Sequence, residues 1–366
     1  MNLNFNNISN LKNVYSLDNK SNIYSYIKNG KSLLINKLEH NNTYTKHLLE
    51  IKETNYVYDY CFSNNTIEDS LDYDNVNNNQ CIIDSLFFLC SKDNPIRLYN
   101  INYNDLNDNL NYTHISNYSI KNDLSIVDPT FCLTYDDFNL YLYSGLRDNS
   151  IMISDIVNEY SYKRNISKAI NKNSIICSII APSSRHVLHN NIITSSFDNS
   201  LSILDKKILS CQEFFIKNNE LDNSSNLINT TKDIQNSAHS ILEYETNKLI
   251  INNRNSNYIS IYDVRNFKNL LDNIKIPRLS NTYSKLDLDI SENLMIFKQS
   301  NNTAVVYDLK NMTKKVEIDI NSLFKISVNL NNENIFYKCC FIDNKKVLFN
   351  LNINNTHNLN SILLLN

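Results

Sequence analysis

The sequence predicts an all-β fold, a single β-propeller of seven blades, and two observations lead to this prediction. First, a strand-like apolar run, a short polar break and a second apolar run recur along the chain. Second, the repeats end on Asp or Asn, at Asn100, Asp155, Asp205, Asp263 and Asp308. These ends lie 55, 50, 58 and 45 residues apart, slightly more than the about 40–45 residues of a WD-repeat blade. A chain of 366 residues also allows two or three ordinary domains, but repeats in register favour one ring.

The clear repeats predict hairpins because their apolar and polar side chains alternate and Ile, Leu, Val and Tyr are frequent. They cover residues 23–38, 84–101, 139–156, 189–206, 246–264 and 292–309. A strand-rich stretch at about 320–353 predicts the last blade. Propeller rings usually close by pairing both chain ends within one blade, so we expect part of residues 1–20 to complete it. Residues 1–366 then form one propeller domain.

The breaks inside the repeats predict tight turns, which need a positive φ that glycine normally supplies. The chain has only 2 glycines, so we expect asparagine to take this role. The candidate turns are Asp93-Asn94, Asp148-Asn149, Asp198-Asn199 and Asn301-Asn302. The closing aspartates correspond to the Asp of a Trp-Asp pair, and we expect each to accept hydrogen bonds within its blade. They are Asp155, Asp205, Asp263 and Asp308.

Two polar stretches, about 63–80 and 217–239, predict loop insertions because they lack strand periodicity. The formal net charge of -3 argues against polybasic coating of nucleic acid. No apolar run reaches the length of a membrane span. The 8 cysteines include no CxxC pair, and no signal-peptide pattern precedes them. We therefore expect a reduced, nuclear or cytosolic compartment.

Catalytic and metal-binding patterns are not found in the sequence. No glycine-rich phosphate loop or nucleophile elbow occurs. His186 and His189, with Cys177 upstream, are a weak metal pattern without further ligands. Cys339 and Cys340 are adjacent on a predicted strand and point to opposite faces. We expect no enzyme activity, no metal or other cofactor, and no small-molecule substrate.

Charge is unevenly distributed along the sequence. Residues 160–197 contain no acid, and basic and aromatic side chains together suit an RNA backbone with unstacked bases. The candidate RNA or partner patch comprises Tyr160, Tyr162, Lys163, Arg164, Lys168, Lys172 and Arg185. Residues 53–91 contain no Lys or Arg but seven acids, Glu53, Asp59, Glu68, Asp69, Asp72, Asp74 and Asp84. A solvated loop is the more common explanation of such a composition, and faces of opposite charge could also orient a protein partner.

Several stretches resemble the WD-repeat telomerase Cajal body protein family, most closely its compact budding-yeast branch associated with splicing. The matching segments occur in family order over residues 23–308. They are Tyr56–Phe62, Ser91–Leu98, Ser174–Ile179, Ser195–Asp198, Arg254, Asp263–Asn266 and Lys285–Asp289. The positions that match family motifs most specifically are Tyr58, Asp59, Tyr60, Asp93, Asn94, Pro95, Arg254, Asp263 and Arg265.

The resemblance implies a non-catalytic nuclear scaffold that associates with small nuclear ribonucleoproteins in pre-mRNA splicing. It would help stabilise engagement of the 5′ splice site, through protein contacts, RNA contacts or both, and we expect it to be a monomer. One alternative is a carrier that binds small nuclear or telomerase RNA and directs its localisation. Another is a protein-only scaffold.

Overall fold

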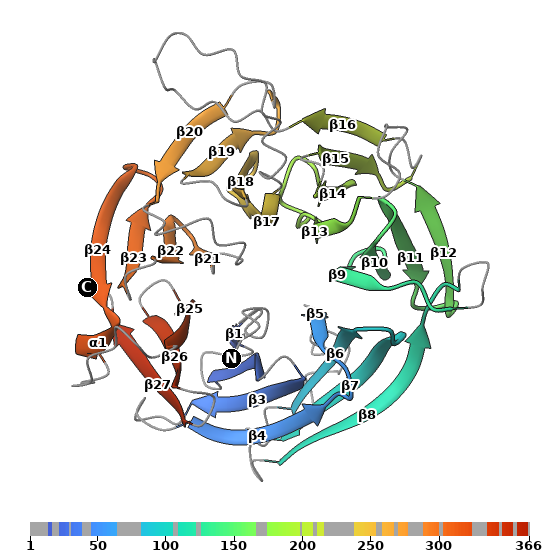
Figure 1. Ribbon diagram of the computed structural model, residues 1–366, viewed down its shortest axis with the longest axis horizontal. Helices are drawn as coiled ribbons and strands as arrows, with labels where there is room; N and C mark the ends of the chain where they lie inside the picture. Colours follow the sequence, from blue (N-terminus) through green and yellow to red (C-terminus); the bar gives the residue numbers. More distant parts are fainter. Residues whose placement is uncertain are drawn as a thin grey trace, which may run out of the picture.

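The computed structural model is a ring of seven β-sheets, each forming one blade around a central axis (Figure 1). In the described residues six sheets have four strands and the seventh has three. The structure describes residues 14–16, 22–28, 31–38, 45–63, 82–104, 109–121, 126–165, 174–197, 200–207, 211–215, 238–253, 258–266, 270–276, 288–299, 303–323, 335–343, 346–353 and 357–364.

The strands follow one another outwards in each blade, so every neighbouring pair is antiparallel and close in sequence. The first four blades comprise β1 (Val14–Ser16), β2 (Asn22–Lys28), β3 (Ser32–Leu38) and β4 (Thr45–Lys52); β5 (Val57–Phe62), β6 (Ile82–Ser91), β7 (Ile96–Asn104) and β8 (Asn109–Tyr118); β9 (Thr130–Asp136), β10 (Tyr141–Leu146), β11 (Ser150–Asp155) and β12 (Tyr160–Asn165); and β13 (Ile176–Ile180), β14 (Asn191–Ser196), β15 (Ser200–Asp205) and β16 (Cys211–Phe215).

The remaining three blades continue the same pattern. They comprise β17 (Ala238–Tyr244), β18 (Lys248–Asn253), β19 (Tyr258–Asp263) and β20 (Leu270–Lys275); β21 (Leu288–Ser291), β22 (Leu294–Lys298), β23 (Thr303–Asp308) and β24 (Thr313–Asp319); and β25 (Ile335–Asp343), β26 (Lys346–Ile353) and β27 (His357–Leu364), with the short helix α1 (Ile320–Leu323) before β25. No helix in these described ranges has the length and apolar character that crossing a membrane requires.

The predicted all-β propeller is confirmed, and each of the six clear repeats contains the two middle strands of a blade. The repeat at 139–156, for example, covers β10 and β11, with Tyr141 opposite Asp155. The last blade extends beyond the predicted 353, because β27 lies at 357–364. Most of the predicted insertions at 63–80 and 217–239 lies outside the described residues, and β17 begins at Ala238.

The expectation that the N-terminal stretch completes the last blade is wrong for the part of it that the structure describes. β1 pairs with β2, with Tyr15 opposite Ile23, and is therefore the innermost strand of blade 1. It contacts β25, the first strand of blade 7. The innermost strands of the first and last blades thus lie next to each other. In the described residues, no strand of one of these blades pairs with a strand of the other.

The apolar core lies in the seams between neighbouring blades rather than inside one sheet. Six clusters of buried side chains each join residues of two successive blades. Between blades 3 and 4, Gly145 of β10 lies so close to its neighbours that an added Cβ would be 2.6 Å from Cys132 Sγ and 2.7 Å from Ile176 Cγ2. Only a residue without a side chain fits this seam.

The expectation that asparagine supplies the positive φ values is largely wrong. Among the described non-glycine residues, positive φ occurs at Asp93, Leu140, Asn149, Glu159, Glu245, Glu292 and Met312. Asn149 is the one asparagine in this set, while the turns Asp198-Asn199 and Asn301-Asn302 lie outside the described residues. Asparagine instead stands one position earlier in three turns, where its side chain donates a hydrogen bond.

Candidate functional site

The family-motif residues of β5 lie in the two seams that blade 2 forms with its neighbouring blades. Asp59 is buried, and its carboxylate accepts a hydrogen bond from the backbone N–H of Leu133, at 2.9 Å. The rings of Tyr58 and Phe131 are 5.2 Å apart, and Tyr60 is fully buried. Tyr58 and Asp59 therefore join blades 2 and 3, whereas Tyr60 packs in the cluster that joins blades 1 and 2.

The segment Asp93-Asn94-Pro95 forms the turn between β6 and β7. Asp93 takes the positive φ, and the side-chain amide of Asn94 donates to the Ser91 hydroxyl at 2.9 Å. Pro95, half-buried, directly precedes β7. Arg254, the remaining isolated motif position, lies outside the described residues.

The closing aspartates accept the hydrogen bonds that the sequence predicts. The Asp155 carboxylate accepts from the backbone N–H groups of Val157 and Asn158 and from the Asn158 amide, each at 2.9 Å. These bonds, led by the backbone N–H of Asn158, lower the pKa of Asp155. Asp308 accepts the same set from Lys310 and Asn311.

The first turn of blade 3 has the same construction. Asp136 accepts from the N–H groups of Phe138 and Asn139 and from the Asn139 amide, the last at 2.8 Å. In all three turns the asparagine closes a ring with the aspartate, and the residue after it, Leu140, Glu159 or Met312, takes the positive φ. We call this four-residue Asp-x-x-Asn unit the closing turn.

In blades 4 and 5 the closing aspartate accepts a hydrogen bond from the backbone N–H of the third residue of the turn. Asp205 accepts from the N–H of Lys207 at 2.8 Å. Asp263 accepts from the N–H and the guanidinium of Arg265, and from the Asn247 amide at 3.1 Å. The hydrogen bonds from Arg265 lower the pKa of Asp263 to about 2.

The third residue of these turns, counted from the aspartate, is exposed in every case. We call it the display position. Lys207, Arg265 and Lys310 occupy it in blades 4, 5 and 6, whereas Phe138 and Val157 occupy it in the two turns of blade 3. The backbone bonds do not depend on the displayed side chain, so its chemistry can differ from blade to blade; in blade 5 the displayed guanidinium also bonds the closing aspartate.

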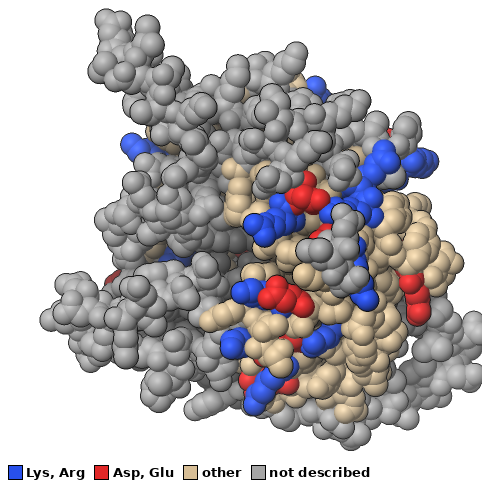
Figure 2. Space-filling model, turned by 45° about the vertical axis from the view of Figure 1, so that its right-hand side comes forward, with Lys and Arg blue, Asp and Glu red and all other residues tan. Residues whose placement is uncertain are grey.

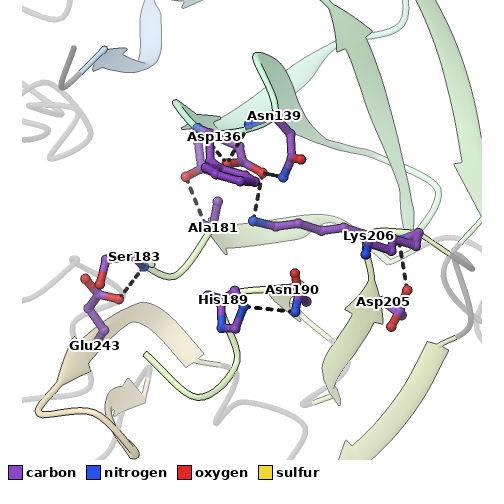
Figure 3. Close-up of polar contacts among 12 residues, drawn as sticks. Asp136, Asn139, Ala181, Ser183, His189, Asn190, Asp205, Lys206 and Glu243 are labelled. Atoms are coloured by element: carbon purple, nitrogen blue, oxygen red, sulfur yellow. Dashed lines mark hydrogen bonds and ion pairs between the residues drawn. The ribbon is translucent and has the colours of Figure 1, made fainter. Parts of the chain in front are cut away.

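Ion pairing joins blade 3 to blade 4 at the same end of the strands. Lys206 Nζ lies 2.7 Å from Asp136 Oδ2, and both side chains are nearly buried, at 7% and 6% exposure. Burial alone would raise the pKa of Asp136, but hydrogen bonds from Asn139 and Lys206 and the charge of Lys206 outweigh it and lower the pKa. Figure 3 shows Lys206 reaching across to Asp136, to which Asn139 also donates a hydrogen bond.

The connection between β13 and β14, residues 181–190, continues this contact to blade 5. The N–H of Ser183 donates to Glu243 at 2.8 Å (Figure 3), and the N–H of Val187 donates to the Thr246 carbonyl at 2.7 Å. His186 is buried; its Nδ1 accepts from the N–H of Leu188, and its Nε2 lies 3.3 Å from the Lys248 carbonyl. Both ring nitrogens of His186 are thus used within the protein.

The remaining residues of the weak metal pattern have protein contacts too. His189 Nδ1 contacts the His186 carbonyl at 3.1 Å, and Cys177 Sγ lies 3.4 Å from the Ser195 carbonyl, on the next strand. No three His, Cys, Asp or Glu side chains in the described ranges gather as metal ligands would.

The acid-free stretch of sequence is not an acid-free surface. Lys163 Nζ lies 2.8 Å from Asp128 and 2.7 Å from Asp148, which the chain brings from before β9 and from the turn after β10. Burial lowers the pKa of Lys163, but the bonds and charges of the two carboxylates outweigh it and raise the pKa. The charge of Lys163 is therefore compensated within blade 3.

Three other members of the predicted patch, Tyr160, Tyr162 and Arg164, alternate along β12 and so share one face of that strand. Tyr160 and Tyr162 have nearly parallel rings, with centroids 6.0 Å apart, and Arg164 lies further along β12. Arg185 lies in the 181–190 connection, at the opposite end of the strands from Asp148. Lys168 and Lys172 lie outside the described residues.

Acids and bases are mixed elsewhere too. Figure 2 shows Lys and Arg side chains beside Asp and Glu across the described surface on this side of the molecule. Of the acidic stretch 53–91, Glu53 is buried against Arg97, at 2.6 Å, and Asp59 is buried in its seam. Glu68, Asp69, Asp72 and Asp74 lie outside the described residues.

Sequence reasoning missed the apolar side chains that blade 3 exposes. Phe138 is 86% exposed and Val157 67% exposed, the two highest values among the large apolar side chains that the structure describes. The signal was present in the sequence. Aligning the closing turns gives DDFN and DIVN in blade 3 against DVRN and DLKN in blades 5 and 6.

Comparison with known proteins supports the fold alone. No protein-family model matches the chain, and no curated protein matches it. A solved structure, Raptor from Chaetomium thermophilum, is similar with a TM-score of 0.60 and 13% sequence identity. The match covers 94% of this chain and 27% of that chain. This protein is thus similar to about a quarter of Raptor in its backbone fold.

Proposed function

We propose that this propeller is a non-catalytic nuclear scaffold that associates with small nuclear ribonucleoproteins in pre-mRNA splicing and helps stabilise engagement of the 5′ splice site. The observation that carries the scaffold role is the closing turn, which holds a fixed backbone while the displayed side chain varies from Phe138 to Lys310. Binding residues occur disproportionately on loops that a rigid scaffold positions.

The splicing assignment is supported by the resemblance of the segments between residues 23 and 308 to the budding-yeast branch of the Cajal body protein family. Protein contact is favoured over direct RNA contact as the means of association. Lys163, the first basic residue of the acid-free stretch 160–197, is held by Asp128 and Asp148, and a phosphate would have to compete with both carboxylates.

Retrieval of the tagged, full-length protein from cell extract, followed by sequencing of the retained RNA, tests this proposal. Enrichment of spliceosomal small nuclear RNA over an unrelated tagged propeller is the expected result. Enrichment of telomerase or guide RNA instead would point to the carrier role. Retrieval of proteins with no enriched RNA would contradict both roles and leave a protein-only scaffold. Sedimentation of the purified chain checks the expected monomer.

A further inference from the structure

We propose that the turns of blade 3 form a docking surface for a partner-protein segment that combines apolar side chains with Lys or Arg. This inference rests on the proposed scaffold function and names the class of partner. The surface consists of Phe138, Leu140, Val157 and Tyr160, and we call it the blade 3 turn surface.

The four side chains come from two turns that the structure ties together. The N–H of Ile156 donates to the carbonyl of Leu140 at 3.2 Å. Asp155 is the register partner of Tyr141 on one side and Tyr160 on the other. The four members are 86%, 38%, 67% and 49% exposed, in sequence order. Clusters of exposed apolar side chains mark contact sites more often than single ones do.

The surface is held in place before a partner arrives. Asp136 and Asp155 each bind two backbone N–H groups and one asparagine amide of their own turn. Lys206 of blade 4 fixes Asp136 further. A preformed surface loses little conformational entropy on binding, which favours affinity.

The charge of the two turns selects the partner. Residues 136–141 and 155–160 contain Asp136, Asp137, Asp155 and Glu159 but no Lys or Arg. The other two acids are Asp137, which is half-buried, and Glu159, which is exposed. An apolar centre with an acidic rim complements a segment that carries apolar and basic side chains.

The same charges disfavour two other occupants. RNA binds through phosphate neutralisation, and acids at the rim repel phosphate. A second copy of this chain in a two-fold contact would bring two acidic patches together, because such an interface uses the same patch twice. A basic partner segment meets neither repulsion.

Binding of short fluorescent peptides to the purified full-length protein tests the inference. The probe alternates Leu and Lys; one control replaces each Lys by Glu, and another replaces each Leu by Ser. The wild-type protein is expected to bind the Leu–Lys peptide in preference to both. Phe138→Ser combined with Val157→Ser should weaken that binding by about tenfold or more.

Matched variants locate the site. Leu271→Ser removes an exposed apolar side chain from β20, in blade 5, and should leave binding unchanged. Asp137→Lys with Glu159→Lys should weaken binding by about tenfold at low salt, with a smaller difference at high salt because salt screens exposed charges. Thermal melts check that each variant is folded.

Several outcomes would overturn the inference. Equal binding by wild type and the Phe138→Ser/Val157→Ser variant, or a preference for the Glu peptide, contradicts the surface or its charge. A dimer that this variant dissociates identifies a second copy as the occupant. Tight binding of an RNA oligonucleotide that this variant abolishes identifies RNA. The assay uses no cell extract, so it can succeed where RNA retrieval fails, and the two proposals remain separable.

Discussion

Blades 3 and 6 contain the same closing turn and present opposite chemistry on it. Asp155 and Asp308 each accept the same three hydrogen bonds, all within 2.9–3.0 Å. The display position is Val157 in blade 3 and Lys310 in blade 6. The Asp–Asn pair fixes the backbone conformation of the turn, and the side chain at the display position contributes almost nothing to that conformation.

This comparison separates residues that build the ring from residues that can contact a partner. Asp59, Tyr60 and Gly145 act in seams between blades, and changing them should affect stability. Phe138 and Val157 lie outside every seam, and changing them should affect binding alone. The predictions below test this division, beginning with the largest expected effect.

Asp136→Ala should destabilise the protein far more than Asp308→Ala. Both variants lose the closing-turn hydrogen bonds, but the first also leaves Lys206 nearly buried without its partner. Breaking a buried ion pair by removing one partner costs about 3–5 kcal/mol. Chemical denaturation of the two variants measures the difference. Equal losses would show that the Asp136–Lys206 pair adds no stability.

Gly145→Ala should destabilise the protein by about 1–3 kcal/mol, the usual cost of overfilling a packed core. The added Cβ would lie 2.6 Å from Cys132 Sγ and 2.7 Å from Ile176 Cγ2. Removing the nearest obstacle, Cys132 Sγ, provides the control, so Cys132→Ala should recover part of the loss in the double variant. An unchanged melting temperature in Gly145→Ala would mean that blades 3 and 4 are less closely packed.

Lys163→Glu should lower the melting temperature, because it brings a third carboxylate to Asp128 and Asp148. The loss of the partly exposed pairs and the new repulsion together are worth about 1 kcal/mol. Lys163→Met removes the charge without the repulsion and should cost less. A stable Lys163→Glu variant would show that this lysine is free for phosphate, as a solvated basic loop would require.

Acid should remove the contribution of Asp263 to stability. Its folded pKa, about 2, lies below the about 3.9 of an unfolded aspartate, so the contribution is complete above about pH 4 and is lost as the pH falls toward 2. Melting temperatures of wild type and Asp263→Asn should therefore converge over this range. A constant difference between them would contradict the pKa assignment.

The sequence alone could predict the propeller because the repeat is local. Alternating side chains, polar breaks and closing aspartates all lie within about 20 residues of one another, and the structure places hairpins there. The aspartate hydrogen bonds follow from the same local pattern, since Asp155 and Asn158 are three residues apart.

The pairing of the charge patch and the conformation of the turns could not be predicted in this way. Asp128 and Lys163 are 35 residues apart and meet only because β9 and β12 belong to one blade. The Leu140 position shows a different limit. Its positive φ is imposed by the ring that Asp136 and Asn139 close, so a bulky residue takes a conformation that its own preference disfavours.

RNA retrieval tests most directly the division between residues that build the ring and residues that can contact a partner. It uses three versions of the tagged protein: wild type, Phe138→Ser with Val157→Ser, and Lys163→Met. If association runs through protein contact at the blade 3 turn surface, the first variant should lose most of the spliceosomal RNA that wild type retains, and Lys163→Met should retain it. Normal retrieval by the first variant and loss in Lys163→Met would contradict the account, and would return the contact to the basic stretch of β12.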